Sequence, residues 1–404
     1  MQYKMNDRKE RNKVSVMRVA TFILSVFIVG MVEMMVAGIM NLMSADLHVS
    51  EAVVGQLVTL YALTFAICGP ILVKLTHRFS ARSVLLWTLL IFIIGNAMIA
   101  LAPNFTILVI GRILSSAAAS LIIVKVLALT AMLTLPKNRG KMIGVVYSGF
   151  SAANVFGVPL GTMIGDIVGW RYTFLFIIVV SVLAGILMLY YLPHQRELQQ
   201  VAGTEQSNGT EASDVPSKII RPQEVVKFIT ITFLILVANS ATFVYINPLI
   251  LSHDYTLRFV SVALLMNGVA GVIGTSLGGV FADKWTSKRW LTISIAVFVV
   301  MMVLLNIILP YAALLLIGIF VWNIMQWSTN PAIQSGLIEQ VEGDTSQVMS
   351  WNMSALNAGI GIGGMIGGLV VSQWEVSFLP YVSAAIGLAG LIITLALSNH
   401  YINN

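Results

Sequence analysis

Residues 19–42 read VATFILSVFIVGMVEMMVAGIMNL, an apolar stretch with a single ionisable side chain, Glu33. About 20 apolar residues in an α-helix, at a rise of ~1.5 Å each, cross the hydrocarbon core of a bilayer. A carboxylate inside such a segment costs on the order of 3 kcal/mol and usually faces a bundle interior or a water-filled cavity. Glu33 is therefore either a structural acid paired with a neighbouring cation or a carboxylate that binds protons or substrate. We favour the second interpretation, because intramembrane acids are commonly functional.

The composition of the chain indicates an integral membrane protein. Its 404 residues are 58% hydrophobic and only 10% charged, whereas ordinary soluble domains are about 25% charged. The apolar runs extend over ~20 residues or more, unlike the ~10-residue alternating segments of a transmembrane barrel. We therefore expect an all-α protein with the lipid bilayer as its surroundings. The formal charge of +6 is carried mainly by loops and does not indicate a nucleic-acid partner.

Twelve apolar runs lie in two groups of six around a polar segment that is typical of a linker. The sequence predicts a cytoplasmic tail (1–18), an N-terminal six-helix half (19–192), a cytoplasmic linker (193–225) and a C-terminal six-helix half (226–404). The predicted spans are roughly 19–42, 53–75, 84–101, 105–135, 142–165, a sixth ending near 192, then 226–251, 259–282, 291–309, 312–336, 348–374 and 378–397.

Loop charges predict the orientation of the chain. Of the 23 Lys and Arg residues, 19 fall in segments on the side of the N-terminus, and only Arg171 and Arg258 fall on the other side. Lys and Arg accumulate in cytoplasmic loops. We therefore expect a multi-pass protein of the cell membrane with both termini in the cytoplasm, and we expect a monomer.

The two halves repeat each other at a nearly constant spacing. The turn VKLTHRFSARSVLL lies 206 positions before GVFADKWTSKRWLT. Concordance in the first, second and fifth spans of each half indicates two related six-helix units in the same orientation. The 206-residue offset pairs Glu33 with Asn239 and Asn41 with Asn247, and an offset near 203 pairs Asn154 with Asn357.

Several stretches resemble the major facilitator superfamily. GGVFADKWTSKR resembles its cytoplasmic loop motif, G-x-x-x-D-R/K-x-G-R/K-R/K, and NVFGVPLGTMIGDIVGWRYTF, LVTLYALTFAICGP and ATFVYINPLI resemble its bacterial drug and sugar efflux branch. The chain is thus similar to the twelve-span drug:proton antiporter group, close to arabinose-efflux and purine-nucleoside-efflux members. The resemblance implies the major facilitator fold, with twelve transmembrane helices in two pseudo-symmetric six-helix bundles.

The loop motifs depart from the family pattern. His77 stands where the family carries Asp and Ser80 where it carries Gly, while the second loop keeps Asp283 but has Thr286 at the Gly position. The resemblance implies that these loops latch helices on the cytoplasmic side in the outward-open state. The expected gate residues are His77, Arg78, Arg82, Asp283, Lys284, Lys288 and Arg289.

Proton coupling requires a group that is protonated on one side of the membrane and released on the other. Glu33 is the only Asp or Glu deep in any predicted span, and Arg112 lies at a similar depth in span four. The resemblance also implies an Arg in span four of proton antiporters. We favour a coupling role for Arg112 over a purely structural one in helix pairing.

Lys125 is a second cation in span four, thirteen residues after Arg112. Three roles remain open: its side chain snorkels to the interface, donates to backbone carbonyls, or binds the substrate. In the last case the substrate carries a negative charge or a carbonyl.

The polar residues of the C-terminal spans are mostly amides accompanied by aromatic rings. This combination suits a neutral, hydrogen-bonding ligand such as a sugar or nucleoside, although interhelical hydrogen bonding is an equally open role. The candidate cavity residues are Asn41, Tyr61, Lys125, Asn154, Asn239, Tyr245, Asn247, Asn323, Gln326, Trp327 and Asn357.

Glycines mark two spans for bending or close packing. In span eleven Gly359, Gly363 and Gly367 recur at four-residue spacing, which lets two helix backbones approach closely. In span five, where the efflux branch usually reads G-P-x-x-G, Pro159 comes two residues after Gly157. We expect Gly157, Pro159 and Gly161 to bend this span and seal it against a neighbour.

These features predict a proton-coupled exporter of a small organic molecule that works by alternating access. The sequence has no phosphate-binding loop, metal-ligand cluster or nucleophile triad, so we expect no cofactor, no metal and no enzymatic activity. One alternative is a facilitator or importer with the same fold, in which Glu33 is structural. Another is a transporter-like sensor that binds its ligand without turnover.

Overall fold

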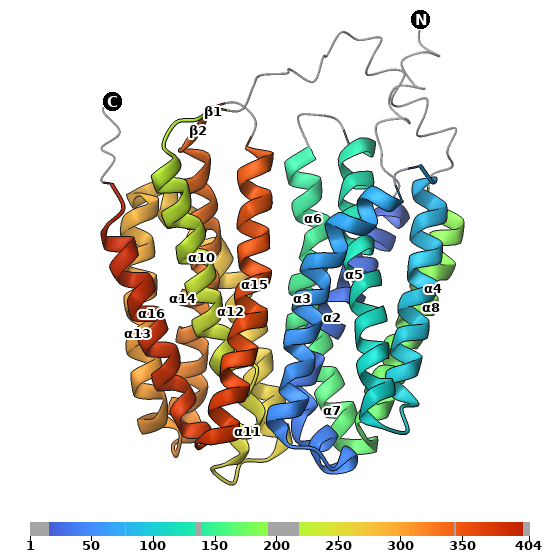
Figure 1. Ribbon diagram of the computed structural model, residues 1–404, viewed down its shortest axis with the longest axis horizontal. Helices are drawn as coiled ribbons and strands as arrows, with labels where there is room; N and C mark the ends of the chain where they lie inside the picture. The colour runs from blue at the N-terminus through green and yellow to red at the C-terminus, as the bar shows by residue number, and fades with distance from the viewer. Residues whose placement is uncertain (1–15, 77, 135–138, 193–217, 343–344, 399–404) are drawn as a thin grey trace, which may run out of the picture. The chain divides into compact units, whose positions relative to one another are not determined.

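The structure is a computed structural model that describes residues 16–76, 78–134, 139–192, 218–342 and 345–398 (Figure 1). Within these ranges, 12 helices are long and apolar enough to cross a membrane. The predicted all-α fold with twelve transmembrane helices is therefore confirmed. Most of the predicted tail and linker, together with His77, lies outside the described residues.

The first six spans begin and end close to the predicted positions, and the fifth is composite. In that span a π-helical segment joins two α-helices, and Pro159, which has no N–H to donate, lies two residues after its end. The elements are α2 (Val16–Leu47), α3 (Glu51–Leu75), α4 (Ala81–Ala100), α5 (Phe105–Leu133), α6 (Arg139–Ala152), η2 (Ala153–Gly157), α7 (Val158–Val168) and α8 (Trp170–Tyr191).

The remaining six spans come after the short strand β1, and a second short strand, β2, lies between α14 and α15. The strands β1 (Lys218–Ile219) and β2 (Val341–Glu342) pair antiparallel, with Lys218 opposite Glu342. The helices are α10 (Pro222–Phe243), α11 (Ile246–Leu251), α12 (Leu257–Trp285), α13 (Ser287–Ile308), α14 (Ala312–Ile338), α15 (Ser346–Gln373), η3 (Val376–Phe378) and α16 (Leu379–Leu395).

The prediction of one continuous helix over residues 226–251 was wrong, because the chain breaks at Tyr245. Tyr245 has φ −105° and ψ 23°. Pro248, three residues later, favours the start of a new helix, since its fixed φ and missing N–H suit a first turn. Ile39, 206 positions earlier, has φ −119° and ψ 18° inside α2. The two repeats therefore share a break at the same position, which hydropathy does not reveal.

The chain forms two compact units whose boundaries pass through helices. The described part of the first unit comprises residues 16–33, 67–76, 78–134, 139–153 and 171–192, and that of the second comprises 34–66, 154–170, 218–342 and 345–398. The boundaries therefore lie within α2, within α3, within η2 and after the first residue of α8.

Close helix packing organises each unit. In the first, α4 packs along α5, and a Cβ added at Gly95 would lie 2.7 Å from the Ser115 backbone nitrogen. In the second, α12 packs along α14, α10 along α15 and α16, and α13 along α14 and α16. A Cβ at Gly363 would lie 2.5 Å from the Val237 carbonyl oxygen. In a bilayer, where lipid tails are as apolar as leucine, such close backbone approach is a main source of helix association.

Candidate functional site

The first part of the candidate site is the contact between α5 and α2 at Glu33. Glu33 is 8% exposed and Arg112 is completely buried. The Arg112 guanidinium donates from Nη1 to the Val32 carbonyl oxygen at 2.8 Å and from Nη2 to the Glu33 carbonyl oxygen at 3.2 Å. A helical carbonyl oxygen has a second lone pair, so it accepts these bonds while keeping its helical one. The guanidinium is thereby fixed to the α2 backbone at the residue that carries the carboxyl group.

The surroundings of Glu33 in the first unit combine charge and burial. The Arg112 guanidinium brings a positive charge to Glu33, because it binds the carbonyl oxygen of that same residue. A buried carboxylate of this kind is expensive to keep charged unless a cation or hydrogen bonds compensate. This arrangement can hold a proton or release it according to how well the cation and water reach the carboxylate.

The second part lies on α10 and α14, at the repeat counterpart of Glu33. Asn239 is 9% exposed and accepts a hydrogen bond at its Oδ1 from the indole N–H of Trp322, at 2.9 Å. Trp322 is completely buried, and the ring of Phe243 meets it edge-on with centroids 6.2 Å apart. Asn239 and Phe243 are one helical turn apart on α10, so both contact the same indole.

A second indole–amide pair joins α14 to α12. The indole N–H of Trp327 donates to Asn267 Oδ1 at 3.3 Å, and Asn267 is 4% exposed. A Cβ added at Gly271, one turn after Asn267, would lie 3.3 Å from the Trp327 ring, so the ring packs directly on that glycine. Sequence reasoning missed Asn267. Its place next to three small residues of α12, in MNGVAG, was the available signal.

The structure joins the repeat counterparts Asn41 and Asn247. Asn247 Nδ2 donates to Asn41 Oδ1 at 3.0 Å and to the Gly38 carbonyl oxygen at 2.7 Å. Asn247 is fully buried, and its Oδ1 has no hydrogen-bond partner among the described residues. Asn41 lies two residues after the break at Ile39, and Asn247 lies two residues after the break at Tyr245. This contact therefore ties α2 to α11 within the second unit.

The Tyr245 side chain packs against small residues of α3 and α15. Its hydroxyl is within 3.3 Å of the carbonyl oxygens of Ala52 and Gly364, and it accepts from Gln56 Nε2 at 3.4 Å. A Cβ added at Gly368 would lie 2.7 Å from the Tyr245 hydroxyl. Sequence reasoning missed Gln56, whose position in an apolar span was the available signal.

The other predicted cavity residues are dispersed. Asn323 and Asn357 each donate to a carbonyl one turn earlier in their own helix, those of Ile319 and Met353. Lys125 is half-buried on α5 and makes no hydrogen bond to a described residue. The remaining members are the buried residues Tyr61 on α3, Asn154 in η2 and Gln326 on α14.

Two of the predicted gate residues bind the ends of helices. Arg82 donates to the carbonyl oxygens of Leu189 at 2.6 Å and Leu192 at 3.1 Å, at the end of α8. Lys288, its repeat counterpart, donates to the Leu397 carbonyl oxygen beyond α16. Cations at the C-terminal end of a helix compensate its unsatisfied carbonyls and its dipole. Arg78, Lys284 and Arg289 are exposed, and the side chains of His77 and Asp283 lie outside the described residues.

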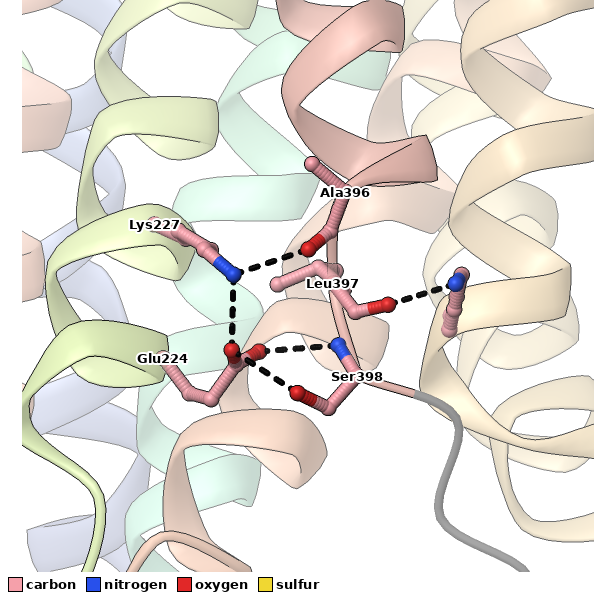
Figure 2. Close-up of polar contacts among 6 residues, drawn as sticks. Glu224, Lys227, Ala396, Leu397 and Ser398 are labelled. Carbon is pink, nitrogen blue, oxygen red and sulfur yellow. Dashed lines mark hydrogen bonds and ion pairs between the residues drawn. The ribbon is translucent and has the colours of Figure 1, made fainter.

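Figure 2 shows a polar cluster between α10 and the end of α16 that sequence reasoning missed. Glu224 accepts from Lys227 Nζ at 2.8 Å, from Ser398 Oγ at 3.0 Å and from the Ser398 backbone nitrogen at 3.1 Å. Lys227 also donates to the Ala396 carbonyl oxygen at 2.8 Å. The three-residue spacing of Glu224 and Lys227 on α10 was the available signal. The cluster holds the end of α16 against the start of α10.

The predicted packing glycines of α15 lie against α10. A Cβ added at Gly359 would lie 2.8 Å from the Phe233 carbonyl oxygen, and one at Gly367 would lie 2.6 Å from the Ala241 carbonyl oxygen. The bending residues of span five lie at the change from η2 to α7: Gly157 ends the π-helical segment, Pro159 is in the first turn of α7, and Gly161 is buried two residues after Pro159.

Twelve spans with a charged group buried in the membrane are features that membrane transporters share. The model of the Major Facilitator Superfamily matches residues 22–343. The chain belongs to this superfamily.

Similar proteins extend over nearly the whole chain. It is 27% identical over 375 residues to the "Uncharacterized MFS-type transporter YbcL" of Bacillus subtilis (strain 168), covering 92% of this chain and 93% of that protein. It is 28% identical over 389 residues to a "Probable sugar efflux transporter" of Helicobacter pylori (strain P12), covering 96% of each. The crystal structure of a D-xylose-proton symporter has a TM-score of 0.75 at 14% identity, covering 94% of this chain and 97% of that one. At this identity the structural match shows the shared fold.

Proposed function

We propose that the protein is a proton-coupled secondary active exporter of a small organic molecule, with substrate and protons exchanged by alternating access. The observation that carries the proposal is the buried Glu33 beside Arg112, which is fixed to the α2 backbone. An intramembrane carboxylate with a cation at hand is the kind of group that proton relays in transporters use.

The export direction is supported by the names of relatives. A protein 28% identical over 96% of the chain is called a probable sugar efflux transporter. The buried amides and rings of α10, α12 and α14 supply hydrogen bonds and apolar walls of the kind that bind neutral polar ligands. In this proposal Glu33 and Arg112 couple protons, and the cavity residues bind the substrate. The loop residues around Arg82 and Lys288 gate the cytoplasmic side, where both termini and the linker lie.

The test is transport by the purified full chain in proteoliposomes. Labelled arabinose, inosine and tetraphenylphosphonium would each be offered outside, with the lumen acidic, with the exterior acidic, and without a gradient. An antiporter takes up substrate when protons flow outward from an acidic lumen, and a protonophore should abolish that uptake. Vesicles without protein provide the background.

Each other outcome contradicts the proposal in its own way. Uptake driven by an acidic exterior would identify a symporter. Uptake that follows the substrate gradient alone would identify a facilitator, in which Glu33 is structural. Binding of a probe without counterflow would identify a sensor.

A further inference from the structure

We infer that Asn239 and Asn267 determine specificity by presenting amide N–H donors to the substrate. The substrate then is a neutral molecule rich in hydroxyl or carbonyl oxygens, and a lipophilic cation is disfavoured. This inference rests on the proposed transport function and adds the polarity of the binding groups.

The orientation of each amide follows from the chemistry of its partner. An indole N–H is a donor only, so it must meet the oxygen of an amide and never its nitrogen. Trp322 therefore fixes Oδ1 of Asn239 toward itself at 2.9 Å. Trp327 does the same to Asn267 at 3.3 Å. In both cases the NH₂ group points away from the indole.

Both indoles are held in place by the residue one turn after the asparagine. Phe243 meets Trp322 edge-on at 6.2 Å, and Gly271 lets the Trp327 ring pack directly on α12. Rotation of either amide would set an NH₂ group against an indole N–H, which would leave buried donors unpaired. The packing therefore keeps both amides in one orientation.

The amide nitrogens remain available. Neither Asn239 nor Asn267 uses its Nδ2 in a hydrogen bond to a described residue, and the two side chains keep 9% and 4% of their surface exposed. Each NH₂ group carries two donors. Ligand oxygens can satisfy them, whereas a cation without acceptors cannot and is also repelled by their positive ends.

The experiment is equilibrium binding to the purified full chain by isothermal titration calorimetry, without a proton gradient. The probes are arabinose, inosine and tetraphenylphosphonium. We expect the wild type to bind arabinose or inosine more tightly than tetraphenylphosphonium. On the wild type alone, deoxyribose should bind several-fold more weakly than arabinose, because it lacks one acceptor hydroxyl.

Two substitutions replace the NH₂ donor by an acceptor oxygen while keeping the hydrogen bond from the indole. In Asn239→Asp and Asn267→Asp one oxygen still accepts from the tryptophan, but the other replaces the NH₂ group. Each should weaken binding of the oxygen-rich probe about tenfold or more, as expected for loss of a buried hydrogen bond together with unpaired acceptors, and should strengthen tetraphenylphosphonium binding. Trp322→Phe keeps the ring but frees the amide to turn, so it should lower the preference between the two probe classes a few-fold.

Asn306→Asp is the matched control, since Asn306 on α13 donates to the Ser377 carbonyl oxygen away from both pairs. It should leave the order of probe affinities unchanged. Tetraphenylphosphonium as the tightest probe, no binding of arabinose or inosine, or unchanged affinities in both Asp variants would overturn the inference. If one of these binding results were found while proton-driven transport persisted, only the assignment of Asn239 and Asn267 as substrate donors would be refuted. If proton coupling were absent but the probe affinities were as expected, that assignment would stand.

Discussion

Glu33 in the first unit and Asn239 in the second are repeat counterparts held in different ways. Arg112 of α5 binds the α2 backbone at Glu33, through the Val32 and Glu33 carbonyl oxygens. Trp322 of α14 binds the Asn239 side chain itself, through Oδ1. Both positions are buried, but only the first carries ionisable groups.

This difference leads us to expect that the two repeats perform two different tasks. A carboxylate held near a fixed guanidinium can change its protonation, whereas an amide held by an indole can only hydrogen-bond. We therefore expect changes in the first unit to alter proton coupling and changes in the second to alter ligand choice.

The largest effect is expected for Glu33→Gln, which makes position 33 neutral like its repeat counterpart Asn239. Uptake driven by an acidic lumen should fall to background, because no other Asp or Glu lies deep in a span. Probe binding without a gradient should remain. The matched control is Glu375→Gln, at an exposed acid before η3, which should transport like the wild type. Gradient-driven uptake by a well-expressed Glu33→Gln protein would refute the division of tasks.

The next effect concerns stability at the same contact. Arg112→Gln leaves the buried carboxylate without its cation and should destabilise the protein by roughly 3–5 kcal/mol. The double variant Glu33→Gln/Arg112→Gln removes both charges and should recover part of that loss. Thermal unfolding of the three purified proteins measures both steps. If the double variant were as unstable as the sum of the two single variants, the charges would not be coupled.

A smaller effect sharpens the comparison of packing in the two units. Gly95→Ala in the first unit and Gly363→Ala in the second each place a methyl group against backbone atoms, at 2.7 and 2.5 Å before relaxation. Overpacking of this kind costs typically 1–3 kcal/mol. Gly279→Ala is the control, since a Cβ there meets nothing within 4 Å. Melting temperatures that fall equally in all three variants would contradict this reading of the helix contacts.

The smallest stability effect is expected for Lys125→Ala. Lys125 is half-buried and has no hydrogen bond to a described residue, so the free energy of unfolding should change by no more than about 0.5 kcal/mol. If Lys125 binds the substrate, as we expect, the Kd of an anionic or carbonyl-bearing probe should rise about tenfold. Unchanged Kd values for every bound probe would assign Lys125 to the membrane interface, and a lower melting temperature would assign it to structure.

The sequence by itself determined the twelve spans, the membrane setting and the twofold repeat. The physical reason is that a bilayer requires long apolar helices with internally satisfied backbones, so length and hydropathy suffice to find them. Glu33 and Arg112 also stood out, because charged residues are costly in such segments.

Only the tertiary structure decided which partners these groups take. Arg112 binds carbonyls 80 and 79 residues away, and Trp322 orients an amide 83 residues away. The sequence contained these residues but no signal for the pairing, since apolar helices of similar hydropathy can pack in many rotations. At the break, the Tyr245 hydroxyl contacts α3 and α15. Pro248 favours a new first turn there, but hydropathy alone predicts one unbroken helix.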